Sequence, residues 1–152
     1  MARIELRPQT DELEPEGSKD VTRDKRGFLV LVRNEIFRFV RAVARRDYAE
    51  AARVMSSPAA GDVALMGAEV REAARIEAEL APFFAEHASI RIDPEARAPK
   101  YLVVEEGDGS WRVRQTILDP AEDNDWFFEA TIDLGRSREA AKPVLVLDRF
   151  GR

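Results

Sequence analysis

The feature that most constrains the fold is a pair of alternating segments, 111–118 and 126–133, joined by an acidic turn. Side chains in a β-strand point alternately to opposite faces, and each segment places apolar residues at every second position. The mostly apolar faces consist of Trp111, Val113, Gln115 and Ile117, and of Trp126, Phe128, Ala130 and Ile132. The opposite faces include Arg112, Arg114, Glu129 and Asp133. The pattern predicts a β-hairpin covered on one side, with an ion pair across its strands.

The turn between these segments, residues 119–125, combines Pro120 with several Asp and Asn side chains, which is typical of loops. It is too long for a two-residue turn, so we expect a wide loop. Its carboxylates, which could bind a hard cation, are Asp119, Glu122, Asp123 and Asp125. The loop lacks the glycine and the distal glutamate of a calcium-binding EF-hand. A solvated turn is therefore favoured over a cation site.

Helical periodicity precedes the hairpin. Apolar residues at i, i+3, i+4 and i+7 predict a first helix over 24–46. Asp47 and Glu50 form a capping-box pattern that predicts a second helix over 48–56. A third helix is expected from Asp62 to Glu86, with a kink or restart at Pro82.

Beyond the third helix the hydrophobic period changes to two. We expect strands at Ser89–Ile92, Tyr101–Glu105 and Val144–Asp148, in addition to the two strands of the hairpin. A short helix is expected at Ser137–Ala141. Helices followed by strands predict an α+β fold, with three N-terminal helices packed on one face of a curved antiparallel sheet of four to five strands. This order resembles the NTF2-like, or cystatin-like, cone. Residues 1–22 are expected to be a flexible arm or linker, and 23–152 a single domain.

Composition excludes several classes of protein. The 152-residue chain has no cysteine, so disulfides and thiolate metal sites are excluded. It has no apolar run long enough to span a membrane and no apolar signal segment at its start. We therefore expect a cytoplasmic location and no membrane partner. Nucleotide-binding glycine loops and the serine-hydrolase elbow are also absent, which argues against an enzyme, and no cofactor is expected.

Charge is distributed unevenly along the chain. Residues 23–53 carry nine basic and four acidic side chains, whereas the whole chain has a net charge of -5. Within the first predicted helix, Arg38, Arg41 and Arg45 lie along one side, with Arg33 nearby. Such a stripe can contact phosphates without reading a base sequence. The competing interpretation is a solvated helix face that pairs with acidic residues elsewhere.

A second group of candidate residues could line a pocket. These residues are His87, Tyr101, Trp111 and Trp126. His87, beside Glu86, could act as a general base, but its position at a helix end also suits the helix dipole. A zinc site based on this single histidine needs more ligands than the chain offers, so no metal site is expected. Tyr48 or Tyr101 with an aspartate could form an acid–base pair, and exposed tryptophans could stack on bases. We favour structural roles for all of these residues.

Several blocks of sequence resemble a known domain. They are Val30–Arg38, Ala44–Tyr48, Leu80–His87, Asp93–Pro99, Trp111–Gln115, Leu118–Pro120 and Ala140–Leu147. Together they resemble the domain of unknown function at the C-terminus of certain bacterial superfamily II DEAD/DEAH-box helicases, over about residues 21–149. The resemblance implies an accessory module of an upstream helicase motor, with no catalytic residues of its own.

Three functions follow as hypotheses. The first is a non-catalytic accessory domain that contacts nucleic acid or a partner through Arg33, Arg38, Arg41 and Arg45. The second is an NTF2-like domain that binds a small molecule or is a small enzyme of unknown substrate. The third is a homodimer formed through an exposed face of the sheet.

Overall fold

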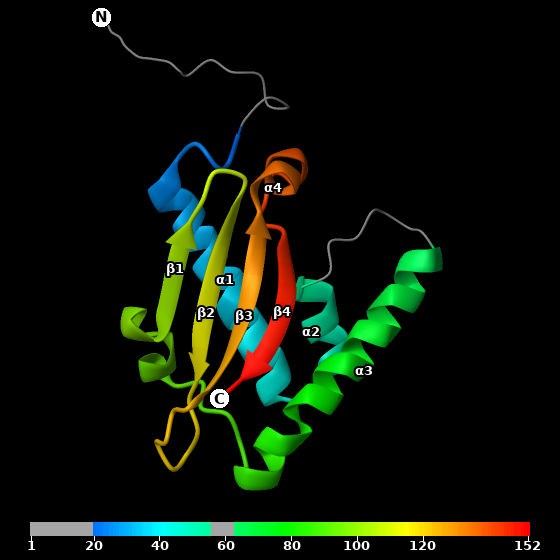
Figure 1. The fold of residues 1–152 in the computed structure, drawn as a ribbon, viewed down its shortest axis with the longest axis vertical. Coiled ribbons are helices and arrows are strands. Elements are labelled where there is room, and N and C mark those ends of the chain that lie inside the picture. Colours follow the sequence, from blue (N-terminus) through cyan, green and yellow to red (C-terminus); the bar gives the residue numbers. More distant parts are fainter. Residues whose placement is uncertain (1–19, 56–62) are drawn as a thin grey trace, which may run out of the picture.

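The computed structural model describes residues 20–55 and 63–152. This part of the chain forms four helices and a four-stranded antiparallel sheet, which confirms the α+β prediction (Figure 1). The helices are α1 (Lys25–Ala44), α2 (Tyr48–Met55), α3 (Val63–Glu86) and α4 (Leu134–Ala140), with short 3₁₀ turns η2 (Pro94–Arg97) and η3 (Pro99–Tyr101). The strands are β1 (Leu102–Glu106), β2 (Ser110–Ile117), β3 (Trp126–Asp133) and β4 (Leu145–Gly151).

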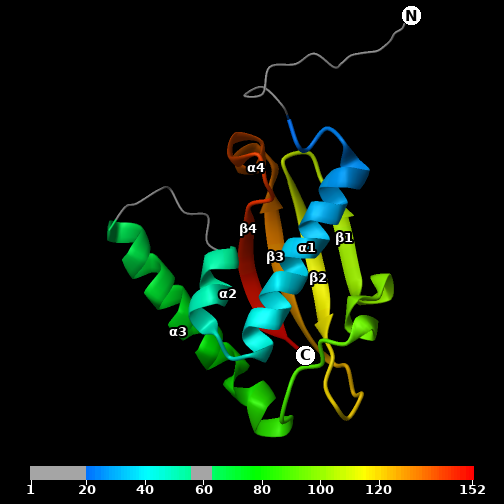
Figure 2. The ribbon, with the colours of Figure 1, turned by 180° about the vertical axis from the view of Figure 1, so that it is seen from behind.

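Helix α1 begins at an aspartate cap. The Asp24 side chain accepts a hydrogen bond from the Gly27 backbone N–H at 3.1 Å, which satisfies one of the free donors of the first turn. Its apolar stripe is buried against the sheet, where the Phe39 and Phe128 ring centroids are 4.9 Å apart. Figure 2 shows α1 lying across one face of the sheet. This helix therefore forms the cover that the hairpin pattern predicts.

The predicted N-cap begins α2, because Asp47 accepts the Glu50 backbone N–H at 3.1 Å. The Glu50 side chain accepts from Arg38 and Arg53 instead of completing the capping box. Helix α3 runs through Pro82 as one helix, so no second helix starts there. Pro82 and Ala78 both lie on the exposed side, where water can hydrate the Ala78 carbonyl that lacks an N–H donor. The predicted cap Asp62, the whole of the expected loop 57–61 and residues 1–19 of the expected arm lie outside the described residues.

The sheet is a meander in the order β1-β2-β3-β4. The predicted hairpin is present as β2 and β3, with Arg114 opposite Glu129 and an ion pair of 2.6 Å between them. Burial alternates along both strands, with Trp111 and Trp126 both buried on the face that packs on the helices. The register thus follows from the side-chain pattern, since a slip of one residue would expose the apolar face.

The strand predicted at Ser89–Ile92 is wrong. This segment is irregular, and the Arg91 backbone N–H donates one hydrogen bond of 2.8 Å to the Leu118 carbonyl. Asp93 and Pro94 follow at once and begin η2, and proline has no N–H to extend a ladder. The chain therefore turns back toward α1 before it enters β1.

Helix α3 lies beside strand β4 at the edge of the sheet rather than over its centre (Figures 1 and 2). The Arg75 guanidinium donates to the backbone carbonyls of Leu147 and Asp148, at 3.2 and 2.7 Å. An uncovered edge strand would present unpaired backbone groups to other chains. Contact with α3 occupies part of that edge. Within the described residues, no helix combines the length and apolarity needed to cross a bilayer.

Candidate functional site

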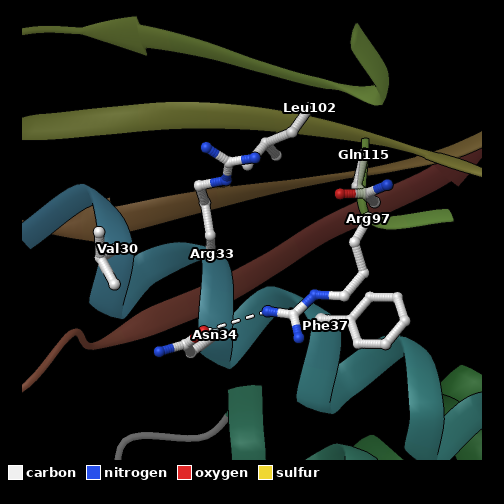
Figure 3. Close-up of a pocket in the computed structure, with 7 residues that line it drawn as sticks. All are labelled: Val30, Arg33, Asn34, Phe37, Arg97, Leu102 and Gln115. Atoms are coloured by element: carbon white, nitrogen blue, oxygen red, sulfur yellow. Dashed lines mark hydrogen bonds between the residues drawn. The ribbon is translucent and has the colours of Figure 1, made fainter. Parts of the chain in front are cut away.

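A cavity of about 220 Å³ lies between α1, η2 and the β1–β2 side of the sheet (Figure 3). Its lining residues are Val30, Arg33, Asn34, Phe37, Arg97, Leu102 and Gln115. A second, adjoining pocket shares Asn34, Phe37 and Arg97 with the first and adds Glu35, Arg38 and Arg41. We call the two pockets together the arginine groove, after Arg33, Arg38, Arg41 and Arg97. Ligand sites are concave in this way, with a few polar groups that converge.

Arg97 is held in place by two contacts with α1. Its Nη2 donates to the Asn34 Oδ1 at 3.1 Å, and its guanidinium carbon lies 4.7 Å from the centroid of the Phe37 ring. Phe37 itself is buried, so the ring is a fixed support for the cation. Neither contact neutralises the charge. Arg97 is therefore oriented in advance for a negatively charged ligand.

The sequence around Arg97 explains why this residue points toward α1. The Asp93 side chain accepts the Ala96 backbone N–H at 3.3 Å and caps η2, and Ala96 is buried below it. The acidic groups of this turn, Asp93 and Glu95, pair with Arg91 at 2.9 and 3.0 Å. Arg97 is thus left without a carboxylate partner among the described residues.

Two further polar groups face the cavity. Gln115 is 5% exposed and lies on the otherwise apolar face of β2, where its Nε2 donates to the Thr116 carbonyl at 2.9 Å. Within the described residues no donor bonds to the Gln115 Oε1, which Figure 3 shows on the side of the amide nearer Arg33. Arg33 is half-buried on α1, and it forms no ion pair with any described carboxylate. A buried amide that lacks a donor is available to a ligand's hydroxyl or amine.

The predicted arginine stripe divides into two kinds of residue. Arg38 pairs with Glu50 at 2.9 Å and lies 3.6 Å from Glu35, and Arg45 lies 4.0 Å from Asp47. These two arginines match the interpretation of a face paired with nearby acids. Arg41 has no such carboxylate among the described residues, and its guanidinium lies 5.8 Å from the Phe37 centroid.

The other predicted residues lie outside the arginine groove and apart from one another. Trp111 and Trp126, each 4% exposed, occupy opposite ends of the hairpin core, with ring centroids 5.2 Å from Phe28 and 5.7 Å from Phe83 respectively. Their burial leaves no free ring face for stacking on a base. Tyr101 is half-buried and donates its hydroxyl to Glu95 at 3.4 Å.

His87 lies at the end of α3, and its Nδ1 is 3.7 Å from the Asp119 Oδ1. Asp119 was expected in a solvated turn, but it is fully buried and accepts the backbone N–H groups of Asp123 and Asn124, at 3.1 and 2.9 Å. Burial raises the pKa of this carboxyl. The backbone donors and His87 outweigh burial, so its pKa lies below the ordinary value.

The sequence analysis missed Arg97 and Gln115 as groove residues. Arg97 lies 63 positions from Asn34, in a segment that was expected to be an irregular connection. Gln115 was assigned to the apolar face of the hairpin, and an amide on such a face is a signal of a polar contact inside the protein.

Comparison with known families identifies the chain. The model of DUF3516, a domain of unknown function, matches residues 2–150. The chain belongs to the DUF3516 family. A search of curated proteins and a search of solved structures found no match to it. The likeness of this DUF3516 domain to the NTF2-like cone therefore stays a prediction.

Proposed function

We propose that this DUF3516 domain is a non-catalytic accessory module that holds the phosphate backbone of a nucleic acid in the arginine groove. The observation that carries the proposal is the convergence of Arg33, Arg41 and Arg97 from two separate elements, with no carboxylate partner among the described residues. Charge-assisted hydrogen bonds from arginine to phosphate are among the strongest polar contacts in proteins. Contacts of this kind fix position without reading the base sequence.

The distribution of charge supports a local site rather than a broadly basic surface. Elsewhere, several arginines pair with acids, as Arg53 does with Glu50, Arg75 with Glu72, and Arg114 with Glu129. A chain with net charge -5 repels nucleic acid over most of its surface. Binding would therefore depend on the groove and on ionic strength.

The size of the cavity favours a phosphate group over a larger molecule. Pockets for drug-sized ligands occupy about 300–1,000 Å³. The half-open cavity beside Arg33 is about 220 Å³, below this range, and a phosphate with its ribose fits it. The adjoining pocket adds about 230 Å³, so a longer stretch of backbone could lie along the groove, and a small-molecule site is the competing hypothesis.

The proposal includes an association with a superfamily II helicase motor. Three of the segments that resemble the helicase-associated domain, Val30–Arg38, Asp93–Pro99 and Trp111–Gln115, supply residues that line the groove. A module of this kind would hold the strand on which the motor acts. ATP hydrolysis would belong to the motor alone.

Fluorescence anisotropy with labelled single- and double-stranded RNA and DNA, across a salt series, tests the proposal. The triple variant Arg33→Ala, Arg41→Ala, Arg97→Ala should bind more weakly. The slope of log K against log salt should fall in magnitude by about 2–3, since each lost phosphate contact removes about one. Circular dichroism checks that the variant is folded.

Arg53→Ala is the matched control, because Arg53 is exposed, lies outside the groove and pairs with Glu50. It should leave both the affinity and the slope unchanged. Arg38→Ala and Arg45→Ala should have small effects, because local acids already neutralise these residues. Equal binding by the triple variant and the wild type would refute the proposal.

A further inference from the structure

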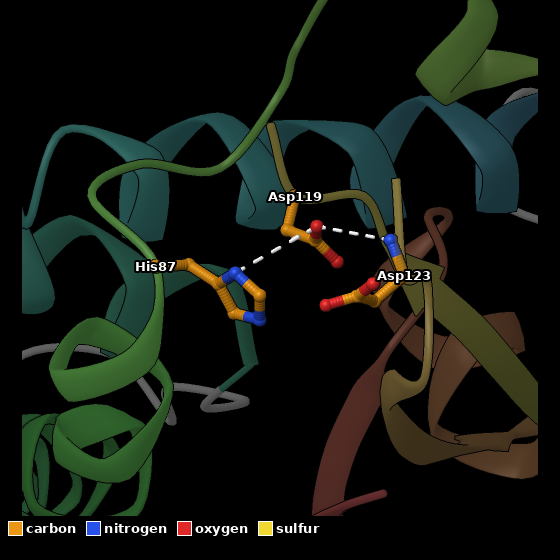
Figure 4. Close-up of side chains that lie close together, drawn as sticks. All are labelled: His87, Asp119 and Asp123. Carbon is orange, nitrogen blue, oxygen red and sulfur yellow. Dashed lines mark hydrogen bonds and ion pairs between the residues drawn. The ribbon is translucent and has the colours of Figure 1, made fainter. Parts of the chain in front are cut away.

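A second cluster of polar groups lies outside the arginine groove, where the end of α3 meets the loop between β2 and β3 (Figure 4). His87, Asp119 and Asp123 each place one potential ligand atom within 4.8 Å of the others. Two segments separated by about thirty residues in sequence thus supply one nitrogen and two carboxylates. The single histidine led us to expect too few ligands for a zinc site. The fold brings two carboxylates of the β2–β3 loop close to that histidine.

The buried His87 side chain makes no hydrogen bond to any residue that the structure describes. Its side chain is 8% exposed, and the nearest carboxylate oxygens lie 3.7 Å from its ring nitrogens, Asp119 from Nδ1 and Glu86 from Nε2. Hydrogen bonds between nitrogen and oxygen rarely exceed about 3.2 Å. Glu86 already accepts from Trp126 and pairs with Arg152. Both carboxylates are at ion-pair distance but beyond hydrogen-bond distance, so a ring nitrogen of this buried imidazole is free to coordinate a cation.

The charge of Asp119 is the second observation. This carboxylate is fully buried, and no lysine or arginine of the described residues lies at ion-pair distance from it. Backbone N–H groups of the loop, among them those of Asp123 and Asn124, donate to the carboxylate, which has about four lone-pair sites in all. On the same loop, the Asn124 Oδ1 is buried without a donor. A buried anion on the same loop as an unsatisfied acceptor favours a cation.

We propose that His87, Asp119 and Asp123 bind a divalent transition-metal cation, for which Zn²⁺ is the probe. Two ligand atoms of a tetrahedral zinc lie about 3.4 Å apart, given bonds of about 2.0–2.1 Å, and the 3.7 Å between His87 and Asp119 is close to this. Imidazole with carboxylates suits zinc, whereas Mg²⁺ and Ca²⁺ prefer oxygen ligands alone. The cation would fasten the loop to α3, with one coordination position open to water.

The test uses the full chain without an affinity tag, titrated with Zn²⁺ and followed by NMR of the imidazole protons. The chain has one histidine and no cysteine, so a shift of these signals reports this site alone. We expect one Zn²⁺ per chain and a melting temperature that rises with Zn²⁺ concentration. Asp123→Asn should weaken binding about tenfold or more, because it removes an exposed ligand without disturbing the core.

Asp125→Asn is the matched control, because it removes the same charge from an exposed position on the same loop. It should retain the affinity of the wild type. Three outcomes would overturn the proposal: no movement of the imidazole signals at millimolar Zn²⁺, equal loss of binding in both variants, or Ca²⁺ binding equal to Zn²⁺ binding. None of these outcomes depends on nucleic-acid binding, so this proposal stands or falls separately from the arginine groove.

Discussion

Arg38 and Arg97 line the same groove but differ in what holds them. Arg38 donates two hydrogen bonds to one carboxylate oxygen of Glu50, at 3.1 and 2.9 Å, so its charge is largely offset. Arg97 is held by the Asn34 amide and the Phe37 ring, which leave its charge intact. Because a ligand responds to net charge as well as to donors, Arg97 contributes more to an anion site than Arg38.

This difference gives a prediction for Asn34. Asn34→Ala removes the hydrogen bond that orients Arg97 but keeps the guanidinium, so it should weaken nucleic-acid binding by about 2- to 10-fold. Arg97→Ala removes the charge as well and should have a larger effect. Anisotropy titrations of both variants measure the order. A larger loss with Asn34→Ala than with Arg97→Ala would contradict the role given to Arg97.

Glu129 provides a pH-dependent test on the outer face of the sheet. It lies 2.6 Å from Arg114 and 2.9 Å from Arg149. The Arg114 hydrogen bond chiefly lowers the pKa of Glu129; burial opposes this, and Arg149 adds to the lowering. Since the folded-state pKa is depressed, the stabilisation is present above the ordinary glutamate pKa and is lost as pH falls through the folded-state value.

Glu129→Gln should therefore lower the free energy of unfolding at pH 7 by about 1 kcal/mol or less, as expected for a partly exposed network. The loss should shrink as pH falls from the ordinary glutamate pKa through the lower folded-state pKa of Glu129. Urea denaturation at pH 7 and pH 3 measures the change, with Glu139→Gln, at an exposed position on α4, as the control. An equal loss at both pH values would rule out a contribution from the ionised carboxylate.

At the scale of elements, helix α3 contacts strand β4 at a β-bulge. Between Glu129 and Ala130 the register of β4 shifts by one residue, so Asp148 is extra. Its carbonyl accepts from Arg75, and its side chain accepts the Thr131 hydroxyl at 2.7 Å. Bulges at sheet edges re-aim backbone groups in this way.

Arg75→Ala should destabilise the fold by about 1–2 kcal/mol, because two backbone carbonyls lose a charged donor. Arg71→Ala, one turn earlier on the exposed side of α3, is the matched control and should have little effect. Urea denaturation measures both variants. No difference between them would mean that the Arg75 hydrogen bonds do not hold α3 at the sheet edge.

Periodicity predicts those elements in which the spacing of apolar side chains shows which face is buried. The hairpin, α1 and α2 are present close to the predicted bounds, since alternation and helical spacing record which face is buried. The strand at Ser89–Ile92 was wrong because a short apolar segment does not reveal whether a partner strand lies beside it. Pro82 did not end α3, since its exposed position allows water to replace the missing donor.

The candidate site was predictable only in part. Arg33 and Arg41 lie in the basic segment that composition identifies, and both line the groove. Arg97, Gln115 and the meeting of His87 with Asp119 depend on how distant segments pack. Periodicity describes one element at a time, so contacts between segments far apart in sequence lie beyond it.

Over the described part of the molecule, α1 covers one face of the meander, α3 lies at the β4 edge, and the other face is lined with charged side chains. This outer face includes the Arg114–Glu129–Arg149 network, with exposed Val103 and Val146 on separate strands. Pairing of two copies through it stays a prediction, which sedimentation at micromolar concentration would test. The arginine groove opens instead between the helical layer and the sheet (Figure 3).

The central claim is that phosphate is bound between α1 and η2, and NMR of the arginine side-chain Nε–Hε groups tests it most directly. On titration with a short single-stranded oligonucleotide, the account predicts shifts at Arg33, Arg41 and Arg97 that weaken with added salt. Arg53 and Arg114, which pair with acids outside the groove, should not move. Shifts centred on the outer face of the sheet, with the three groove arginines unchanged, would contradict the account.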